Sequence, residues 1–253
     1  MMKKNNLSVL ILSKNNEDVL ENCLKSTEKL ICEIFIFDSN STDKTLTIAK
    51  RYTKKIHDYK GLNLGKKRKF AINKARTEWI LFLDADERLS NKLIKEINTT
   101  ISEYSKYNSF FIPFANHYLG KRVRHGGENY KMIRLLKKSD TLIKPSLVHE
   151  EIYSKTKKTG VLNGKIFHYS YRSINQLYTK FTDYAFKEAE QKSLVGESSS
   201  LKKIFLYPLH MFWSRFIKDK GYKDGLFRIP LDLGFAYMEF LTYIFLPFYK
   251  IKK

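Results

Sequence analysis

Two carboxylates lie two residues apart at the end of an apolar run. The run is Trp79–Leu83, and Asp84 and Asp86 follow it. A buried strand places such side chains at its carboxyl end, which is the edge of an open α/β sheet where ligands bind. Carboxylate oxygens there suit a hard divalent cation that can bridge to a diphosphate. The pattern therefore predicts a metal-assisted site for a phosphorylated ligand.

A second apolar run, Ile34–Phe37, also ends in an aspartate, Asp38. An acidic pair alone is common on solvated turns, so this repetition of the arrangement strengthens the interpretation. The polar residues 39–43 that follow predict a turn and a helix cap. The two runs together favour a ligand site at the carboxyl ends of the strands.

Residues 7–104 alternate between strands and helices, which predicts a mostly parallel sheet covered on both faces. The expected strands are 7–12, 34–38, 55–59 and 79–83, and the expected helices begin near residues 17, 43, 66 and 90. Beyond residue 105 the pattern changes to shorter strands and one long amphipathic helix. These are strands 109–114, 131–136, 148–153 and 165–171 and helix 174–192. We expect one α/β domain over residues 1–195, with a regular half (1–104) and a less regular half (105–195).

Residues 201–253 stand apart as a basic, aromatic segment that follows the linker candidate Gly196–Ser200. The stretch Ile229–Tyr249 is apolar, but Asp232 and Glu239 interrupt it, whereas a membrane-spanning helix needs about 20 largely uncharged residues. Helices in the membrane interface, with cations facing lipid phosphates and aromatic rings among the headgroups, fit better. A core-packing appendage or a dimer interface would show the same pattern, and both alternatives stay open.

The net charge of +21 is spread over all 253 residues. It favours contact with anionic membranes, nucleic acid or phosphorylated substrates, although a lysine-rich composition alone would give the same excess. With 43% hydrophobic and 14% aromatic residues, the chain is expected to fold. Its two cysteines, Cys23 and Cys32, are too few for a disulfide framework, and we expect buried thiols in a reducing cytoplasm.

Several short motifs occur in a fixed order along the chain. They are Ser8–Glu17 (SVLILSKNNE), Phe37–Asp43 (FDSNSTD), Gly65–Arg68 (GKKR), Leu83–Glu87 (LDADE), His125–Gly127 (HGG), Arg134–Lys137 (RLLK), Val148–Glu150 (VHE) and His168–Tyr171 (HYSY). By their order and spacing, the chain resembles the family 2 glycosyltransferases over about residues 7–190. Within that family it is similar to the lipopolysaccharide-core β-1,4-glucosyltransferase branch. The loop 13–17 departs from the commoner family pattern, and the Q-x-x-R-W motif of processive synthases is absent, which favours addition of a single sugar.

The resemblance implies a GT-A fold, which is an α/β fold with a mixed, mainly parallel sheet, here followed by a C-terminal helical appendage. Residues 1–104 would form its nucleotide-sugar half and residues 105–195 its acceptor half. The resemblance also implies a UDP-sugar donor, a divalent metal (Mg²⁺ or Mn²⁺) and inversion at the anomeric carbon.

For the donor, the resemblance assigns roles to residues of the strand ends and of one helix start. Asp38 would bond the base or ribose, and Lys66 and Arg68 would hold the diphosphate at a helix N-terminus. Asp84 would contact the ribose or support the metal through water. Asp86 would bind the metal itself.

An inverting transfer needs a base for the acceptor hydroxyl, and the acidic position of the family falls on Glu150. Strand alternation sends Glu150 and Glu151 to opposite faces, so only one of them would enter the cleft, and a base elsewhere in the chain is a further alternative. His168 is a candidate additional metal ligand. His125 and Arg134 are candidates for the acceptor pocket. A structural role is also open for His168.

We expect an enzyme that transfers a hexose, glucose first, to a lipopolysaccharide or lipooligosaccharide core or another lipid-linked glycan. It would act at the cytoplasmic face of the membrane, with anionic lipid and without nucleic acid as a partner. Transfer of galactose, an N-acetylhexosamine or rhamnose in capsule, O-antigen or glycoprotein assembly is the alternative within the family. A nucleotidyltransferase would need a G-x-G-x-R loop that residues 13–16 lack. A non-catalytic basic module would leave Asp38, Asp84 and Asp86 unexplained.

Overall fold

The computed structural model describes residues 6–61, 64–103, 105–144 and 151–249. These residues form two compact units. The first unit contains residues 6–114, 131–144 and 151–168, and the second contains residues 115–130 and 169–249.

The first unit carries the alternating strands and helices that the sequence predicts. Its elements are β1 (Leu7–Ser13), α1 (Leu20–Lys25), β2 (Glu33–Asp38), α2 (Thr45–Lys50), β3 (Ile56–Asp58), α3 (Leu64–Lys74), β4 (Trp79–Asp84), β5 (Glu87–Leu89), α4 (Asn91–Ser102), β8 (Lys131–Lys137), β9 (Thr141–Lys144), β10 (Glu151–Ser154) and β11 (Thr159–Val161). A short 3₁₀ turn, Lys138–Asp140, joins β8 to β9. Strands β6 (Ser109–Tyr118) and β12 (Ile166–Tyr171) begin in this unit and continue into the second.

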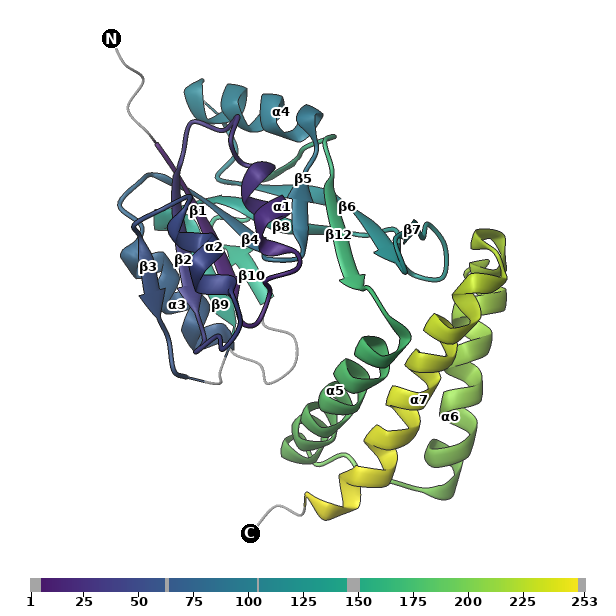
Figure 1. Ribbon diagram of the computed structural model, residues 1–253. Helices are drawn as coiled ribbons and strands as arrows, with labels where there is room; N and C mark the ends of the chain where they lie inside the picture. The colour runs from purple at the N-terminus through teal and green to yellow at the C-terminus, as the bar shows by residue number, and fades with distance from the viewer. Residues whose placement is uncertain (1–5, 62–63, 104, 145–150, 250–253) are drawn as a thin grey trace. The chain divides into compact units, whose positions relative to one another are not determined.

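The main sheet has the strand order β3-β2-β1-β4-β8-β6-β12-β5 (Figure 1). Strands β1 to β4 are parallel, and β8 joins β4 in the antiparallel sense. In the register, Ser13 lies opposite Asp38 and Leu12 lies opposite Asp84. The carboxyl ends of three parallel strands therefore bring Ser13, Asp38 and Asp84 to one edge, and the predicted mixed, mainly parallel sheet is confirmed.

Apolar residues of β1 point alternately into two separate cores. Val9 and Ile11 pack in the core that contains residues of α1, α2 and α4, whereas Leu10 and Leu12 pack in the core that contains residues of α3. Every residue of β1 is buried, as a strand covered on both faces requires. Cys23 is fully buried in the first core, but Cys32 is only partly buried because it precedes β2.

Among the differences from the elements expected from the sequence, two boundaries and one strand are the most relevant. Helix α1 begins at Leu20, after residue 17, because the Glu17 carboxylate accepts the Lys44 amide of a neighbouring loop (2.8 Å) and does not cap the helix. Strand β6 continues past residue 114 to Tyr118. Strand β5 was not expected, and its residues pair with β12 in the antiparallel sense.

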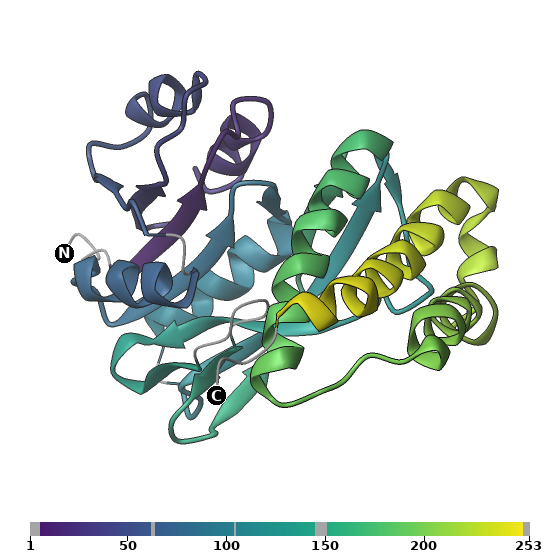
Figure 2. The ribbon, with the colours of Figure 1, turned by 90° about the horizontal axis from the view of Figure 1, so that it is seen from below.

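The second unit is mainly helical. Its elements are β7 (Lys121–Arg122), α5 (Ile174–Leu194), α6 (Leu201–Trp213) with a π-helical continuation (Ser214–Lys218), two 3₁₀ turns (Gly221–Asp224 and Leu226–Arg228), α7 (Ile229–Phe245) and a last 3₁₀ turn (Leu246–Phe248). Helix α7 lies between α5 and α6 in both views (Figure 1, Figure 2). At Gly234 of α7 an added Cβ would meet the Phe181 ring of α5 at 2.9 Å, so the two helices pack closely there.

The predicted linker, residues 196–200, is a bonded connection between helices. Ser200 caps α6 by accepting the Lys203 amide (3.3 Å). The Glu197 carboxylate accepts from Tyr243 OH (2.7 Å) and from Lys203 Nζ (3.0 Å). These bonds tie the connection to both α6 and α7.

A buried ion network fixes the start of α7. Arg228 and Asp232 are both fully buried, and Arg228 Nε donates to Asp232 Oδ2 at 2.7 Å. Arg228 also donates to Asp224 Oδ2 (3.1 Å) and to the carbonyl oxygen of Gly126 (3.0 Å). Arg215 adds a bond to Asp232 Oδ1 (3.1 Å). Each buried charge is thus paired, as burial requires.

The motif His125–Gly127 owes its glycine to this network. Gly126 has φ +60°, and a Cβ there would lie 2.1 Å from Arg228 Nη2. Both the backbone conformation and the close approach of the guanidinium group therefore require glycine. His125 beside it is held by Asp224, whose Oδ1 lies 2.8 Å from Nδ1.

Candidate active site

The loops after β1 and β2 are joined by hydrogen bonds at the sheet edge. Asn15 N donates to Ser41 Oγ (2.9 Å), and Asn15 Oδ1 accepts from the Thr42 amide (2.9 Å). Asn15 and Asn40 adopt positive φ (50° and 55°), which asparagine tolerates better than most residues. The two loops therefore form one preformed wall of the edge.

Asp38 is 3% exposed and holds the turn that follows it. Its Oδ1 accepts from Ser41 Oγ (2.6 Å) and its Oδ2 from the Ser41 amide (2.8 Å). A pocket of about 560 Å³ lies beside it, lined also by Asn40, Leu46 and Asp58. Asp38 thus combines a structural bond to the turn with a place in a pocket wall.

Helix α3 presents Lys67 and Arg68 to the protein interior and leaves Lys66 exposed. Lys67 Nζ donates to Ser39 Oγ (2.7 Å) and to the Ser13 carbonyl (3.3 Å), so it joins the ends of β1 and β2. Burial lowers the pKa of Lys67 to about 8, although nearby carboxylates oppose this. Lys66 and Arg68 were the basic residues predicted to hold the diphosphate, and Lys67 was not predicted.

The helical period could have identified Lys67. Lys67, Ala71 and Ala75 are spaced four residues apart, and both alanines are fully buried against the sheet. Residues at this spacing share one face of a helix. The apolar face of α3 therefore indicates which basic residue points inward.

Asp84 lies between two guanidinium groups. Its Oδ2 accepts from Arg134 Nη2 at 2.9 Å, and its Oδ1 lies 3.5 Å from Arg68 Nη2. Burial raises the pKa of this carboxyl, but Arg134 and Arg68 outweigh the burial and hold the pKa well below its usual range. Its side chain is still 30% exposed. Asp84 is therefore an ionised group that a ligand can reach.

Glu87, the first residue of β5, belongs to the same cluster. It is fully buried, its Oε1 accepts from Arg134 Nη2 (2.6 Å), and its Oε2 accepts the Asp84 amide (2.9 Å). Burial raises the pKa of Glu87, with Arg134 opposing and Asp84 adding to the rise. Glu87 thus anchors both Arg134 and the backbone at the acidic pair. Glu87 and Leu89 are both buried in the alternating pattern of β5, a strand that pairs with β12, and local sequence patterns do not predict this pairing.

Asp86 and His168 come together across the β5–β12 pair. Asp86 Oδ1 lies 3.6 Å from His168 Nε2, and the two side chains are 15% and 21% exposed. Within the described ranges no group of three or more His, Cys, Asp or Glu could hold a metal ion. The Asp86 carboxylate fits Mg²⁺ or Mn²⁺, which commonly take few protein ligands and complete their coordination with phosphate and water. The His168 imidazole is a poor ligand for Mg²⁺ and, of these two ions, suits Mn²⁺ better.

The remaining candidates lie in different places. Arg134 belongs to the acidic cluster through Asp84 and Glu87. His125 belongs to the second unit, beside Asp224. Glu150 lies outside the described residues. Their roles in base and acceptor chemistry stay predictions, as do the donor and metal roles of the other candidates.

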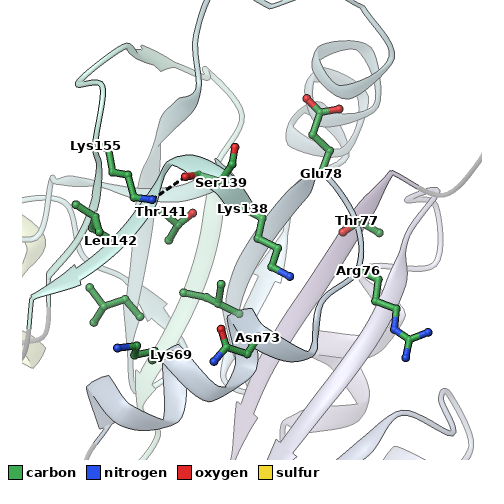
Figure 3. Close-up of a pocket in the computed structure, with 12 residues that line it drawn as sticks. Lys69, Asn73, Arg76, Thr77, Glu78, Lys138, Ser139, Thr141, Leu142 and Lys155 are labelled. Carbon is green, nitrogen blue, oxygen red and sulfur yellow. Dashed lines mark hydrogen bonds between the residues drawn. The ribbon is translucent and has the colours of Figure 1, made fainter.

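A separate pocket of about 640 Å³ lies between α3 and β9 (Figure 3). Thr77 and Glu78, which line it, precede β4, so it is at the opposite end of that strand from Asp84. Its Lys155 donates to the Ser139 carbonyl (2.9 Å). This pocket contains none of the acidic pair.

Comparison of folds defines the class of protein. The structure of Staphylococcus aureus TarS 1–349 in complex with UDP-GlcNAc matches with a TM-score of 0.51 at 14% identity, covering 98% of this chain and 93% of that chain. The chain has the GT-A fold. The sequence model "Glycosyl transferase family 2" matches residues 8–173, and the chain belongs to that family.

Curated relatives match over nearly the whole chain. An uncharacterized glycosyltransferase, RP128, of Rickettsia prowazekii is 29% identical over 251 residues, which cover 95% of this chain and 85% of the relative. The lipopolysaccharide core biosynthesis glycosyltransferase LpsC of Rhizobium meliloti is 26% identical over 263 residues, covering 99% of this chain and 93% of LpsC. The predicted family is therefore confirmed.

Proposed function

We propose that this family 2 enzyme transfers a hexose, glucose first, from a UDP-sugar to a lipopolysaccharide or lipooligosaccharide core or another lipid-linked glycan, with inversion and by single displacement. The observation that carries the proposal is the cluster of Asp84, Glu87 and Arg134 at the carboxyl ends of the strands, with Asp86 beside it. The likeness to LpsC over almost the entire chain supports the choice of acceptor.

Donor binding is assigned to the edge formed by the first three parallel strands. The pocket beside Asp38 would take the base and ribose, and the preformed loop wall would need little ordering when the nucleotide binds. Lys67 and Arg68 would face the diphosphate from α3, and Asp84 would accept from a ribose hydroxyl. Arg134 would keep Asp84 oriented and ionised.

Asp86 and His168 would hold the divalent metal. When bound, the metal neutralises charge on the diphosphate leaving group. Glu150 is proposed as the base that takes the proton of the acceptor hydroxyl, and His125 as part of the acceptor pocket. The site of action is proposed to be the cytoplasmic face of the membrane.

The donor is tested by measuring nucleotide release from a panel of UDP-, GDP- and dTDP-sugars with Mg²⁺ or Mn²⁺. We expect slow release from one donor, UDP-glucose first, that requires the metal and is lost in Asp86→Ala. UDP-galactose and UDP-N-acetylglucosamine in the panel distinguish the alternative sugars. A folded protein that neither releases nor binds any nucleotide with metal would refute the proposed function.

The acceptor is tested by adding purified lipopolysaccharide cores, with and without their lipid A part, to the donor identified in this way. We expect sugar transfer to a truncated core and increased nucleotide release. Transfer only to acceptors that lack lipid would contradict the lipid-linked class while leaving the donor assignment intact.

A further inference from the structure

Helix α6 exposes apolar residues along one side. No residue of α6, all of which are described, is buried. Leu201 (75% exposed), Phe205 (58%) and Leu209 (67%) recur every four residues, and Trp213 (49%) continues the stripe. Residues at this spacing share one helix face. We call this stripe, with Leu206, the outer face of α6.

The opposite side of α6 accounts for its contact with the protein. Ile204 packs against the core formed by Tyr243 and Leu246, and the rings of Tyr207 and Tyr243 lie 5.4 Å apart. Helix α6 is therefore apolar on two sides: one side packs on α7, and the outer face is exposed. An apolar face of this extent on a soluble surface marks a site of interaction.

Cations flank the outer face. Lys202 lies on the helix, and Lys218, Lys220 and Lys223 follow it, all four exposed. Between residues 201 and 223 the only acid in the sequence is Asp219. Apolar and aromatic side chains bordered by lysines match a bilayer surface that offers an apolar interior beneath anionic phosphates.

Helix α7 has the composition of a membrane helix but not the contacts. In the described part of the chain, Leu226–Phe248 is the one helical stretch long and apolar enough to span a bilayer, with mean hydropathy 1.3. Yet Arg228 and Asp232 within it are fully buried and paired in the ion network, and Gly234 packs on α5. Insertion of α7 across a bilayer would break these contacts.

We infer that α6, and not α7, attaches the enzyme to anionic membranes. The helix lies in the plane of the interface, with the outer face at the boundary of headgroups and acyl chains and the lysines on lipid phosphates. The inference rests on the proposed function, because membrane attachment would bring the enzyme to a lipid-linked acceptor. It does not depend on which sugar is transferred.

Charge argues against a second copy of the chain as the occupant. Two copies stacked through the outer face in a C2 arrangement would bring Lys202 and the lysines after Trp213 near their equivalents, in a chain of net charge +21. Anionic lipid removes this repulsion. The membrane is therefore the occupant that the observations favour.

Vesicle binding tests the inference without donor or acceptor. Phosphatidylcholine vesicles with and without phosphatidylglycerol are cosedimented with the full chain, and tryptophan emission is recorded. Trp79 is 3% exposed and Trp213 is 49% exposed, and these are the two tryptophans of the chain, so a blue shift reports on Trp213. We expect binding and a blue shift with phosphatidylglycerol only, and weaker binding in high salt.

Three leucine or valine positions provide matched variants. Leu209→Glu should weaken vesicle binding about tenfold or more. It removes a leucine that the bilayer would bury and adds a negative charge that the anionic lipid repels. Leu233→Glu on α7 (Leu233 is 46% exposed) and Val161→Glu in the first unit (51%) carry the same change in charge and should bind as the wild type does. Phe205→Ser repeats the test on α6 without a new charge.

Three outcomes would overturn the inference. The first is wild-type protein that binds neither vesicle. The second is loss of binding in Leu233→Glu with retention in Leu209→Glu, which would assign the membrane to α7. The third is a wild-type dimer in sedimentation that Leu209→Glu dissociates. Donor hydrolysis that persists in a protein without vesicle binding would leave the proposed function intact, and vesicle binding without hydrolysis would leave the α6 assignment intact.

Discussion

Each unit of the molecule contains a cluster of arginine and carboxylate groups, and the two clusters differ in their exposure to solvent. In the first unit, Arg134 bridges Glu87 and Asp84, and the Asp84 side chain is 30% exposed. In the second unit, Arg228 and Asp232 are fully buried and bonded on several sides.

The difference separates two uses of the same chemical groups. A closed network satisfies its charges within the protein and therefore holds chain segments together. An open one maintains charge where a ligand can meet it, with pKa values displaced from their usual ranges by burial and by neighbouring groups. We therefore expect damage to the second-unit cluster to cost stability and damage to the first-unit cluster to cost activity.

The largest effect is expected for Arg228→Ala, which leaves the buried Asp232 carboxylate unpaired. The free energy of unfolding in urea should fall by about 3–5 kcal/mol. The control Lys223→Ala changes an exposed cation of the same unit and should alter it by less than about 0.5 kcal/mol. Arg228→Met combined with Asp232→Leu should recover much of the loss, and an unaltered urea midpoint in Arg228→Ala would show that the network is dispensable.

Asp86→Ala should lower activity strongly and leave stability unchanged. Because Asp86 is proposed to hold the metal that neutralises the leaving group, kcat should fall about 10²–10³-fold, and the urea midpoint should stay near the wild-type value. Glu28→Ala, an exposed carboxylate of the same unit, is the matched control. If Asp86→Ala loses stability in proportion to activity, the contrast between the clusters fails.

Lys67 predicts a pH dependence of donor binding. Its pKa is lowered to about 8, so the ammonium group is mostly charged at pH 7 and mostly neutral at pH 9. Because the charged form attracts the diphosphate, KM for the donor should rise about tenfold over that interval. Lys67→Arg keeps its charge and should flatten the profile. An identical rise in Lys67→Arg would assign the dependence to another group.

The smallest effect is expected for Ser41→Ala. It removes the 2.6 Å bond from Ser41 Oγ to Asp38 Oδ1 and the 2.9 Å bond that Ser41 Oγ accepts from the Asn15 amide, and it leaves the bond from the Ser41 amide to Asp38. Loss of one bond to a charged group is worth about 1.5–3 kcal/mol at most, and the remaining amide bond should limit the rise in donor KM to a fewfold change. A change in kcat with constant KM would contradict a role of this turn in donor binding.

The strands at the edge were predictable because their local pattern is strong. Buried runs that end in Asp38 and Asp84 have one stable arrangement in a parallel sheet, and the register places both at the same edge. To predict Lys67, one needs to know which face of α3 packs against the sheet. Glu87 required the β5–β12 pairing, a contact between residues about 80 positions apart that no local window contains.

The closed cluster of the second unit could not be predicted from local sequence patterns either, because its partners are far apart in the chain. In the sequence, Asp232 is an acidic interruption of an apolar stretch. Its partners Arg215 and Arg228 reach it only in the folded chain, where the 3₁₀ turns bring them to the start of α7. The carbonyl oxygen of Gly126 likewise accepts from Arg228, a contact that the sequence around Gly126 does not predict, and the acceptor-pocket role of His125 stays a prediction. Tertiary contacts decide the roles of such charges.

Gly126 and Arg228 meet across 102 positions of the chain. On the ribosome, the segment around Gly126 emerges long before the helix that completes its hydrogen bonds, by roughly 5–20 s at usual synthesis rates of about 5–20 residues per second. In that interval Tyr118 and Val123 lack the Leu231 contact of their native core. The second unit of the nascent chain therefore exposes these apolar side chains until Leu231 has emerged, and the yield of the protein in cells should depend on chaperones and on growth temperature.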